Sequence, residues 1–262
     1  MSKDTTRYIL QLQYDGTDFV GWQEQPNGRT VQGVLEERLS TVLRTPIKIV
    51  GAGRTDTGVH ASYMVAHFDL PSSVSETELD QALFRLRRFL PSDIYLIGHQ
   101  AVAPDFHARF SATSRSYGYY ITLVPSPFLR QYHTYIPYEL DREAMNQAAE
   151  ALLGKHDFSS FAKKHSDVTH HICTVTQAEW QALTDTEWVF RVSANRFLRS
   201  MVRALVGTLL QVGSGRLTPQ QFREILLQAD DEYPFNTAPA TGLRLEGITY
   251  SPELLHLPQS PT

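Results

Sequence analysis

The residues of this sequence whose types and spacing best suit chemistry lie in one glycine-rich segment, Gly51 to His60. It reads Gly-Ala-Gly-Arg-Thr-Asp-Thr-Gly-Val-His, so the carboxylate of Asp56 stands two residues after the guanidinium of Arg54, among small residues. Three glycines within eight residues indicate tight backbone turns or the close approach of another molecule. A carboxylate presented in this way can act as a nucleophile or as a general base.

Two other interpretations of the segment compete with catalysis. A phosphate-binding loop is disfavoured, because the dinucleotide pattern needs a glycine where Asp56 stands and no Gly-Lys-Ser/Thr run follows. A structural Asx-turn, in which Asp56 accepts hydrogen bonds from nearby backbone amides, fits the residues about as well as catalysis does. The segment alone leaves that choice open.

The distribution of charge points to an anionic partner, although the net charge of −4 does not. Two stretches, residues 106–138 and 188–223, contain no Asp or Glu. Segregation of this kind can produce one basic face on an acidic protein, and chance clustering on separate surfaces is the alternative. The arginines of the two stretches are Arg109, Arg115, Arg130, Arg191, Arg196, Arg199, Arg203, Arg216 and Arg223.

The composition bounds the class of protein. With 262 residues, of which 42% are hydrophobic, the chain can form one large globular unit or two smaller ones. Its single cysteine, Cys173, allows no internal disulfide and argues against structural zinc. The polar N-terminus carries no signal segment, and Arg199 and Arg203 interrupt the longest apolar stretch, 197–212, so we expect a cytoplasmic protein that does not span a membrane.

Hydrophobic periodicity predicts the elements that position the segment. Helix starts are marked by capping residues at Thr30, Ser75, Asp141 and Thr218. Hairpins with interspersed helices favour an α+β fold with a mainly antiparallel sheet. The stretch 155–171 has little periodicity and is expected to be an exposed insertion, and the tail 257–262 to fray. Strands are predicted at 7–14, 47–50, 62–70, 94–102, 114–124, 172–183, 187–194 and 244–250, and one long helix at 197–212.

Five ordered motifs make the chain similar to a known family. They run from about Tyr8 to Tyr250 and so cover nearly the whole sequence. In these five motifs the chain resembles the TruA family of tRNA pseudouridine synthases. The motifs are Tyr14–Gln23, Gly53–Ala61, Phe106–Tyr117, Asn195–Arg203 and Ala238–Leu243.

The resemblance implies a fold and a reaction. The fold would be α+β, with two similar lobes of mainly antiparallel sheet flanked by helices, a basic cleft between them, and lobes at 1–105 and 106–262. The enzyme would be a homodimer that converts uridine to pseudouridine at positions 38, 39 and 40 of the tRNA anticodon arm, without a cofactor or metal. Asp56 would be the catalytic aspartate, Arg203 its partner, Tyr117 the residue that stacks on the flipped uracil, and Arg54 the residue that enters the RNA stack.

Other residues of the motifs are candidates for substrate binding. His60 and His107 are more often structural hydrogen-bonding groups than catalysts, since no metal-ligand spacing links them. The basic runs Lys163–His165 and His170–His171 are either solvated loop or phosphate contacts. The remaining candidates are Thr55, His60, Arg109, Arg115, Arg196 and Arg199.

The reaction suits these residue types. Pseudouridine formation breaks the bond between ribose C1′ and uracil N1 and joins C5 to C1′, so nothing is oxidised and no group is lost. A glycosidase usually needs two carboxylates, whereas this segment offers one, which favours an isomerase that keeps its base bound. Two other functions stay open: a non-catalytic RNA-binding module, and an RNA N-glycosylase with an aspartate nucleophile.

Overall fold

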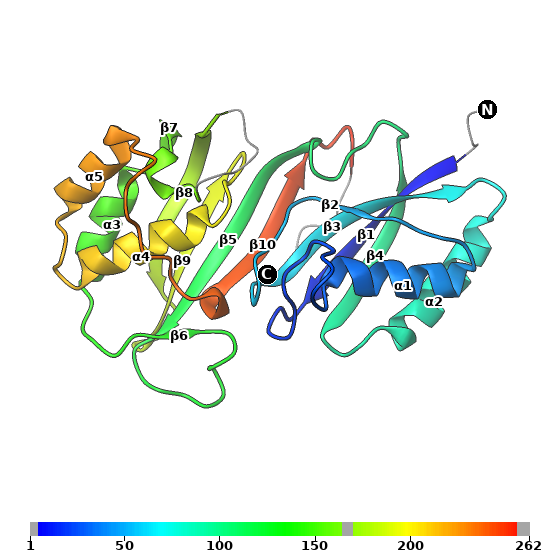
Figure 1. The fold of residues 1–262 in the computed structure, drawn as a ribbon, viewed down its shortest axis with the longest axis horizontal. Helices are drawn as coiled ribbons and strands as arrows, with labels where there is room; N and C mark the ends of the chain where they lie inside the picture. Colours follow the sequence, from blue (N-terminus) through cyan, green and yellow to red (C-terminus); the bar gives the residue numbers. More distant parts are fainter. Residues whose placement is uncertain (1–4, 164–169, 256–262) are drawn as a thin grey trace. The chain divides into compact units, whose positions relative to one another are not determined.

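The computed structural model describes residues 5–163 and 170–255, which form two compact units (Figure 1). The first unit takes the chain up to Thr113 and again from Leu245 onward. The second unit takes Ser114–Arg244. The strands of both units belong to one ten-stranded sheet, and each unit has its own helices and its own buried apolar residues.

The first unit contains strands in the order β4-β1-β3-β10; β1 is antiparallel to both β3 and β4, and the short β2 is antiparallel to β3. Its two helices begin where capping residues predict: the hydroxyl of Thr30 accepts from the Gly33 amide, and Ser75 and Glu78 form a capping box. The elements are β1 (Thr5–Tyr14), α1 (Val31–Leu43), β2 (Val50–Gly51), β3 (His60–Pro71), α2 (Glu76–Phe89), β4 (Ile94–Val102) and β10 (Leu243–Tyr250).

The second unit has the strand order β5-β9-β8-β7, with the short β6 parallel to β5. A capping box between Thr218 and Gln221, with Pro219 in the first helical position, starts its last helix. The elements are β5 (Ala112–Thr122), β6 (Thr134–Tyr135), α3 (Arg142–Glu150), β7 (Gly154–Asp157), β8 (Ile172–Ala182), β9 (Glu187–Ala194), α4 (Met201–Gly213) and α5 (Pro219–Gln228), with 3-10 turns at Ser159–Phe161 and Ala240–Gly242.

The α+β class with a mainly antiparallel sheet is confirmed. The extents of the two units differ from the lobes expected at 1–105 and 106–262, because residues 106–113 and the C-terminal strand group with the first unit. The phenol of Tyr250 donates to the carbonyl of Ala108 at 2.7 Å, and the ring of Tyr250 lies 5.1 Å from that of Phe106. The chain therefore leaves the first unit after its core is nearly complete and returns to it with β10.

The prediction of an exposed insertion at 155–171 is wrong for its first half. Residues 154–157 form the edge strand β7, and the side chains of Phe158 and Phe161 are fully buried. The ring of Phe161 packs 5.7 Å from that of Phe222 on α5. A short edge strand of mostly polar residues gives no alternating pattern, so only the two phenylalanines could have signalled it. Lys164, His165 and the tail 257–262 lie outside the described residues.

Two further element boundaries differ from expectation. The strand expected at 47–50 is reduced to Val50–Gly51. The helix expected from Phe197 begins at Met201, because Ser200 has a φ of 60°, in the left-handed region that an α-helix does not use. Within the residues that the structure covers, no helix has the length and apolarity needed to cross a membrane.

Candidate functional site

The glycine-rich segment is anchored at Thr55, the residue before Asp56. The hydroxyl of Thr55 shares a buried hydrogen bond of 2.9 Å with the phenol of Tyr14, at the end of β1. The carbonyl of Thr55 accepts from the amide of Trp22 at 3.1 Å. Both the side chain and the backbone of Thr55 are therefore fixed by the segment Tyr14–Trp22, which sets the direction in which the next residue leaves.

Close packing between these two segments requires a glycine at position 21. Gly21 has a φ of 105°, which L side chains rarely adopt. A Cβ atom there would lie only 2.5 Å from the carbonyl oxygen of Thr55. The turn is closed further on by hydrogen bonds from the Val59 amide to the Asp56 carbonyl and from the Gly58 amide to the Phe19 carbonyl, each of 3.2 Å.

Asp56 and Arg54 are the charged residues of this turn that could contact a substrate. Asp56 is half-buried and Arg54 is exposed. A Cβ atom at Gly53 would find no heavy atom within 4 Å, so the turn borders open space there. The segment therefore presents a carboxylate and a guanidinium from a backbone that is held on its other side.

His60 is buried at the start of β3, and its contacts are structural. Its Nδ1 accepts from the Gly16 amide at 3.0 Å, so that nitrogen carries no proton. The 3.1 Å approach of the same nitrogen to Asp15 is then not an ion pair. A side chain that is only 4% exposed favours the structural interpretation of His60 over substrate contact.

In the second unit, Tyr117 lies in the middle of β5, opposite Val192 of β9. Its half-buried ring meets the ring of Phe197 edge-on, with centroids 5.2 Å apart. Tyr119 lies two residues further along the strand and so faces the same side. The phenol of Tyr119 donates to the carbonyl of Pro239 at 2.9 Å and shares a hydrogen bond of 2.7 Å with Thr134.

Arg203 lies in the first turn of α4 and is fixed to a nearby loop. Its Nε donates to the carbonyl of Ala238 at 2.7 Å, and the Ala238 amide donates to the carbonyl of Arg203 at 2.9 Å. The helix can approach this closely because residue 207 is glycine, where a Cβ atom would overlap the carbonyl of Asn236. The bond to the Ala238 carbonyl therefore helps to orient the guanidinium.

Arg203 and Tyr119 meet at the loop residues Ala238 and Pro239. Burial raises the pKa of the Tyr119 phenol, and the charge of Arg203 acts on the same phenol in the opposite direction, so the guanidinium lies near Tyr119. Tyr117 and Tyr119 share a strand face, and Tyr119 and Arg203 bond to the neighbouring carbonyls of Pro239 and Ala238.

The other predicted arginines are divided between the units. Arg109, in the first unit with Arg54, is exposed and lies over the ring of Phe110 at 5.6 Å. In the second unit, Arg115 donates to the carbonyl of Asn195 at 2.9 Å, and Arg199 is exposed. Arg196 is half-buried near Cys173, where burial raises the pKa of the thiol to about 11 and the charge of Arg196 opposes that rise.

The sequence did not single out the residues that support the site. Tyr14 and Trp22 hold Thr55, and Tyr119 links the loop at Pro239 to β5. Tyr14 and Trp22 lie inside the motif Tyr14–Gln23, which was the available signal for them, whereas Tyr119 lies two residues beyond the motif Phe106–Tyr117. Among residues 5–163 and 170–255, no three His, Cys, Asp or Glu side chains are grouped so that they could hold a metal ion.

Comparisons with known proteins give one consistent family. A family model described as tRNA pseudouridine synthase matches residues 11–111 and 148–251, which include Asp56 and Arg203 but not Tyr117. A protein named tRNA pseudouridine synthase A from Bacteroides thetaiotaomicron is 48% identical over 252 residues, covering 95% of this chain and 92% of its own length. The proteins of the same name from Porphyromonas gingivalis and Latilactobacillus sakei are 45% and 39% identical, cover 95% and 94% of this chain, and are themselves covered to 98% and 99%.

Proposed function

This chain belongs to the family of tRNA pseudouridine synthases, and we propose that it converts uridine to pseudouridine at positions 38, 39 and 40 of the tRNA anticodon arm with Asp56 as its catalytic group. The observation that carries the proposal is the anchoring of Thr55. Tyr14 and Trp22 fix that residue by side chain and backbone, which defines the backbone position from which the half-buried side chain of Asp56 leaves. A preorganised carboxylate of this kind is what nucleophilic or general-base chemistry at a nucleoside needs.

The reaction needs the target uridine outside the base stack. Extrusion of a stacked base costs on the order of a few kcal/mol. We assign Arg54 to the gap that the base leaves, since its side chain is exposed on the anchored turn. We assign Tyr117 to stacking on the uracil, since an aromatic face offsets part of the extrusion cost.

Arg203 is proposed to orient and neutralise the carboxylate of Asp56. A guanidinium holds a carboxylate in fixed geometry through two parallel hydrogen bonds. The Nε of Arg203 is already bound to the Ala238 carbonyl, which limits rotation of its planar head. Asp56 then attacks the nucleoside covalently or removes a proton from its sugar. The glycosidic bond breaks, the bound base turns, and C5 forms the new bond to C1′, which releases the carboxylate of Asp56 where it had attacked. The proton that C5 gives up is matched by the proton that N1 takes, so the net change is an isomerisation.

We also propose which residues bind tRNA, where the protein acts and how it assembles. Thr55, His60, Arg109, Arg115, Arg196 and Arg199 are proposed to contribute to tRNA binding, His60 through the turn that it supports. We propose a cytoplasmic homodimer that acts on tRNA without a metal or organic cofactor.

One experiment tests the proposal against its competitors. Purified protein and its Asp56→Ala variant are incubated with unmodified tRNA, pseudouridine is detected by chemical labelling and primer extension, and free uracil is measured in parallel. We expect pseudouridine with the wild type and none with Asp56→Ala, which should still bind tRNA. Binding without product by either protein would indicate an RNA-binding module, and released uracil would indicate a glycosylase.

A further inference from the structure

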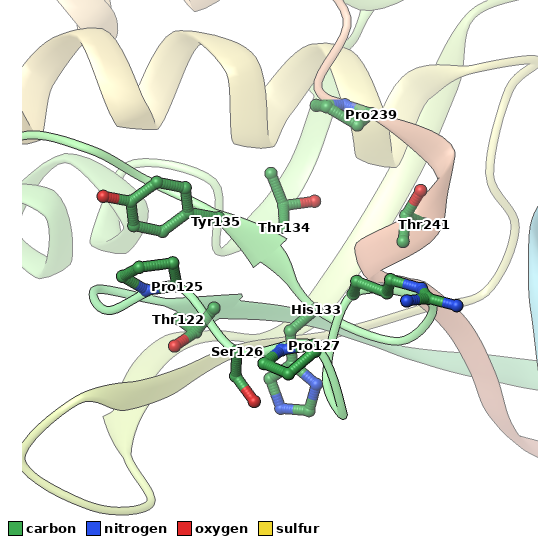
Figure 2. A pocket seen from close by; sticks show the side chains of 10 residues that line it. Thr122, Pro125, Ser126, Pro127, His133, Thr134, Tyr135, Pro239 and Thr241 are labelled. Atoms are coloured by element: carbon green, nitrogen blue, oxygen red, sulfur yellow. The ribbon is translucent and has the colours of Figure 1, made fainter.

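The second unit contains an open pocket that the catalytic assignment does not use. Its volume is about 520 Å³, within the range of roughly 300–1,000 Å³ that is usual for ligand sites. One wall comes from the loop 125–127 and from residues 133–135, and the other from Pro239 and Thr241, which arrive from a distant part of the sequence (Figure 2). Because its walls come from segments far apart in the sequence, the pocket is formed by the folded unit and not by a single loop.

The surface of the pocket combines flat apolar groups with hydroxyls. Pro125, Pro127 and the 46%-exposed ring of Tyr135 offer faces against which a planar ring can pack. Ser126 and Thr241 supply hydroxyl groups that can bond to the edge of such a ring. None of the lining residues is acidic.

One arginine lines the pocket, and one carboxylate lies near it, since Glu187 is 3.5 Å from the imidazole of His133. Arg130 lines the pocket and is exposed. A second guanidinium, that of Arg244, lies 4.5 Å from the ring centre of Tyr120, which in turn packs against the ring of His133. Burial lowers the pKa of His133, Glu187 opposes this and Arg244 adds to it, so the imidazole is neutral near pH 7. An anionic group would therefore be attracted to the arginines.

The pocket adjoins the part of the second unit that carries Arg203. Pro239 lines the pocket, and the preceding residue, Ala238, accepts the hydrogen bond from Arg203. Tyr119 links both walls, because its phenol bonds to Pro239 on one side and to Thr134 on the other. An RNA strand bound next to Arg203 would therefore lie beside the pocket.

We propose that this pocket binds an unpaired nucleotide of the substrate RNA, distinct from the target uridine. The base packs between Tyr135 and the two prolines, and a phosphate pairs with Arg130. A nucleotide is the ligand class that presents a planar ring, hydrogen-bonding edges and a negative charge together. The inference rests on the proposed function, because it takes the substrate to be RNA.

The variants Tyr135→Ala and Arg130→Ala test the proposal, with Tyr135→Phe as the conservative partner of the first. Arg142→Ala is the matched control, because Arg142 belongs to the same unit but stacks on Trp188 and does not line the pocket. The affinity of each full-length protein for unmodified tRNA is measured at several salt concentrations, together with kcat and KM for pseudouridine formation.

We expect Tyr135→Ala to weaken tRNA binding by about 5-fold or more, since stacking on one base is lost. Tyr135→Phe should bind like the wild type, because it keeps the ring. Arg130→Ala should lower the slope of log affinity against log salt by about one, as the loss of one phosphate contact predicts. The value of kcat at saturating tRNA should not change, because the pocket does not touch the reacting atoms.

The proposal is overturned if Tyr135→Ala and Arg130→Ala bind tRNA as Arg142→Ala does while the wild type forms pseudouridine. It is also overturned if sedimentation shows that these variants dissociate an oligomer, since the surface would then bind a second copy of the chain. If the wild type forms no pseudouridine, the proposed function fails, whereas the tRNA affinities of the pocket variants still decide whether the pocket binds RNA.

Discussion

The phenol of Tyr14 and the hydroxyl of Thr55 share a buried hydrogen bond of 2.9 Å that joins the end of β1 to the residue before Asp56. The two residues are far apart in sequence, and the bond gives the glycine-rich turn a fixed support in the first unit. The turn is therefore supported from β1 in addition to its own hydrogen bond between Val59 and Asp56, and the contribution of β1 can be tested by changing residues outside the turn.

Tyr14→Phe should lower both stability and turnover. The ring still packs against Trp22, at a centroid distance of 6.0 Å, but Thr55 loses its partner. We expect the free energy of unfolding to fall by about 1 kcal/mol, the usual net value of one hydrogen bond, and kcat to fall while tRNA affinity stays close to wild type. Tyr8→Phe, on the same strand but stacked on Phe68, is the control. Unchanged kcat in Tyr14→Phe would show that this bond does not position Asp56.

Gly21→Ala should damage the same turn from the other side. The left-handed φ and the clash with the Thr55 carbonyl together should destabilise the protein by about 2 kcal/mol or more. Gly53→Ala is the matched control, because its Cβ atom enters open space, and it should change the unfolding free energy by less than about 1 kcal/mol. Denaturant unfolding of the two variants decides the point. Equal stability of both would mean that the close approach at Gly21 is relaxed at little cost.

Much of the fold could be predicted from local patterns. The bounds of β4 and β9 agree with the alternating runs 94–102 and 187–194. The starts of α2 and α5 follow from capping boxes, which are complete within four residues of sequence. The start of α4 could not be predicted in this way, because the left-handed Ser200 lies inside a continuous apolar pattern and nothing in that pattern ends the helix.

The candidate site was also predictable only where local sequence patterns mark it. The composition around Asp56 singles out the segment but leaves catalysis and an Asx-turn open, and the acid-free stretch 188–223 contains six arginines without distinguishing among them. The roles predicted for Asp56 and Arg203 therefore depend on the family resemblance. The anchoring of Thr55 by Tyr14 and Trp22 depends on contacts across tens of residues, which no local pattern encodes. The pocket beside Pro239 was missed because its two walls come from segments that are adjacent only in the folded unit.

Arg203→Lys should separate catalysis from binding. A lysine keeps the positive charge but loses the planar fork and the Nε that donates to Ala238. We expect kcat to fall at least about 10-fold, as the loss of one charge-assisted hydrogen bond would produce, while the Kd for tRNA changes little. Arg142→Lys serves as the control for a general effect of the substitution. A loss of affinity with unchanged kcat would instead make Arg203 a phosphate contact.

The stability of the protein should depend on pH through His67. Burial, followed by the charge of Arg7, lowers the pKa of His67 to about 4, and its Nδ1 accepts from the Ala108 amide at 3.1 Å. Between pH 4 and 6.5 the unfolded chain binds more protons at this residue than the folded protein does, so stability rises with pH across that window. The total change is on the order of 3 kcal/mol.

Urea unfolding at several pH values between 4.5 and 7 measures this dependence. The variant His67→Gln should show a smaller slope than the wild type, with a residual slope from His107, whose pKa burial also lowers. His170→Gln, an exposed position, should keep the wild-type slope. If His67→Gln keeps it as well, the imidazole of His67 is not the group responsible.

The central claim is that the Asp56 carboxylate, and not its bulk or its fold-supporting contacts, performs the chemistry. Single-turnover formation of pseudouridine in an excess of enzyme over unmodified tRNA, compared between the wild type and Asp56→Asn, tests it most directly, because binding and product release do not limit the signal. We predict that Asp56→Asn binds tRNA and unfolds like the wild type but forms no detectable pseudouridine at positions 38, 39 and 40. Product formation by Asp56→Asn at the wild-type rate would contradict the account.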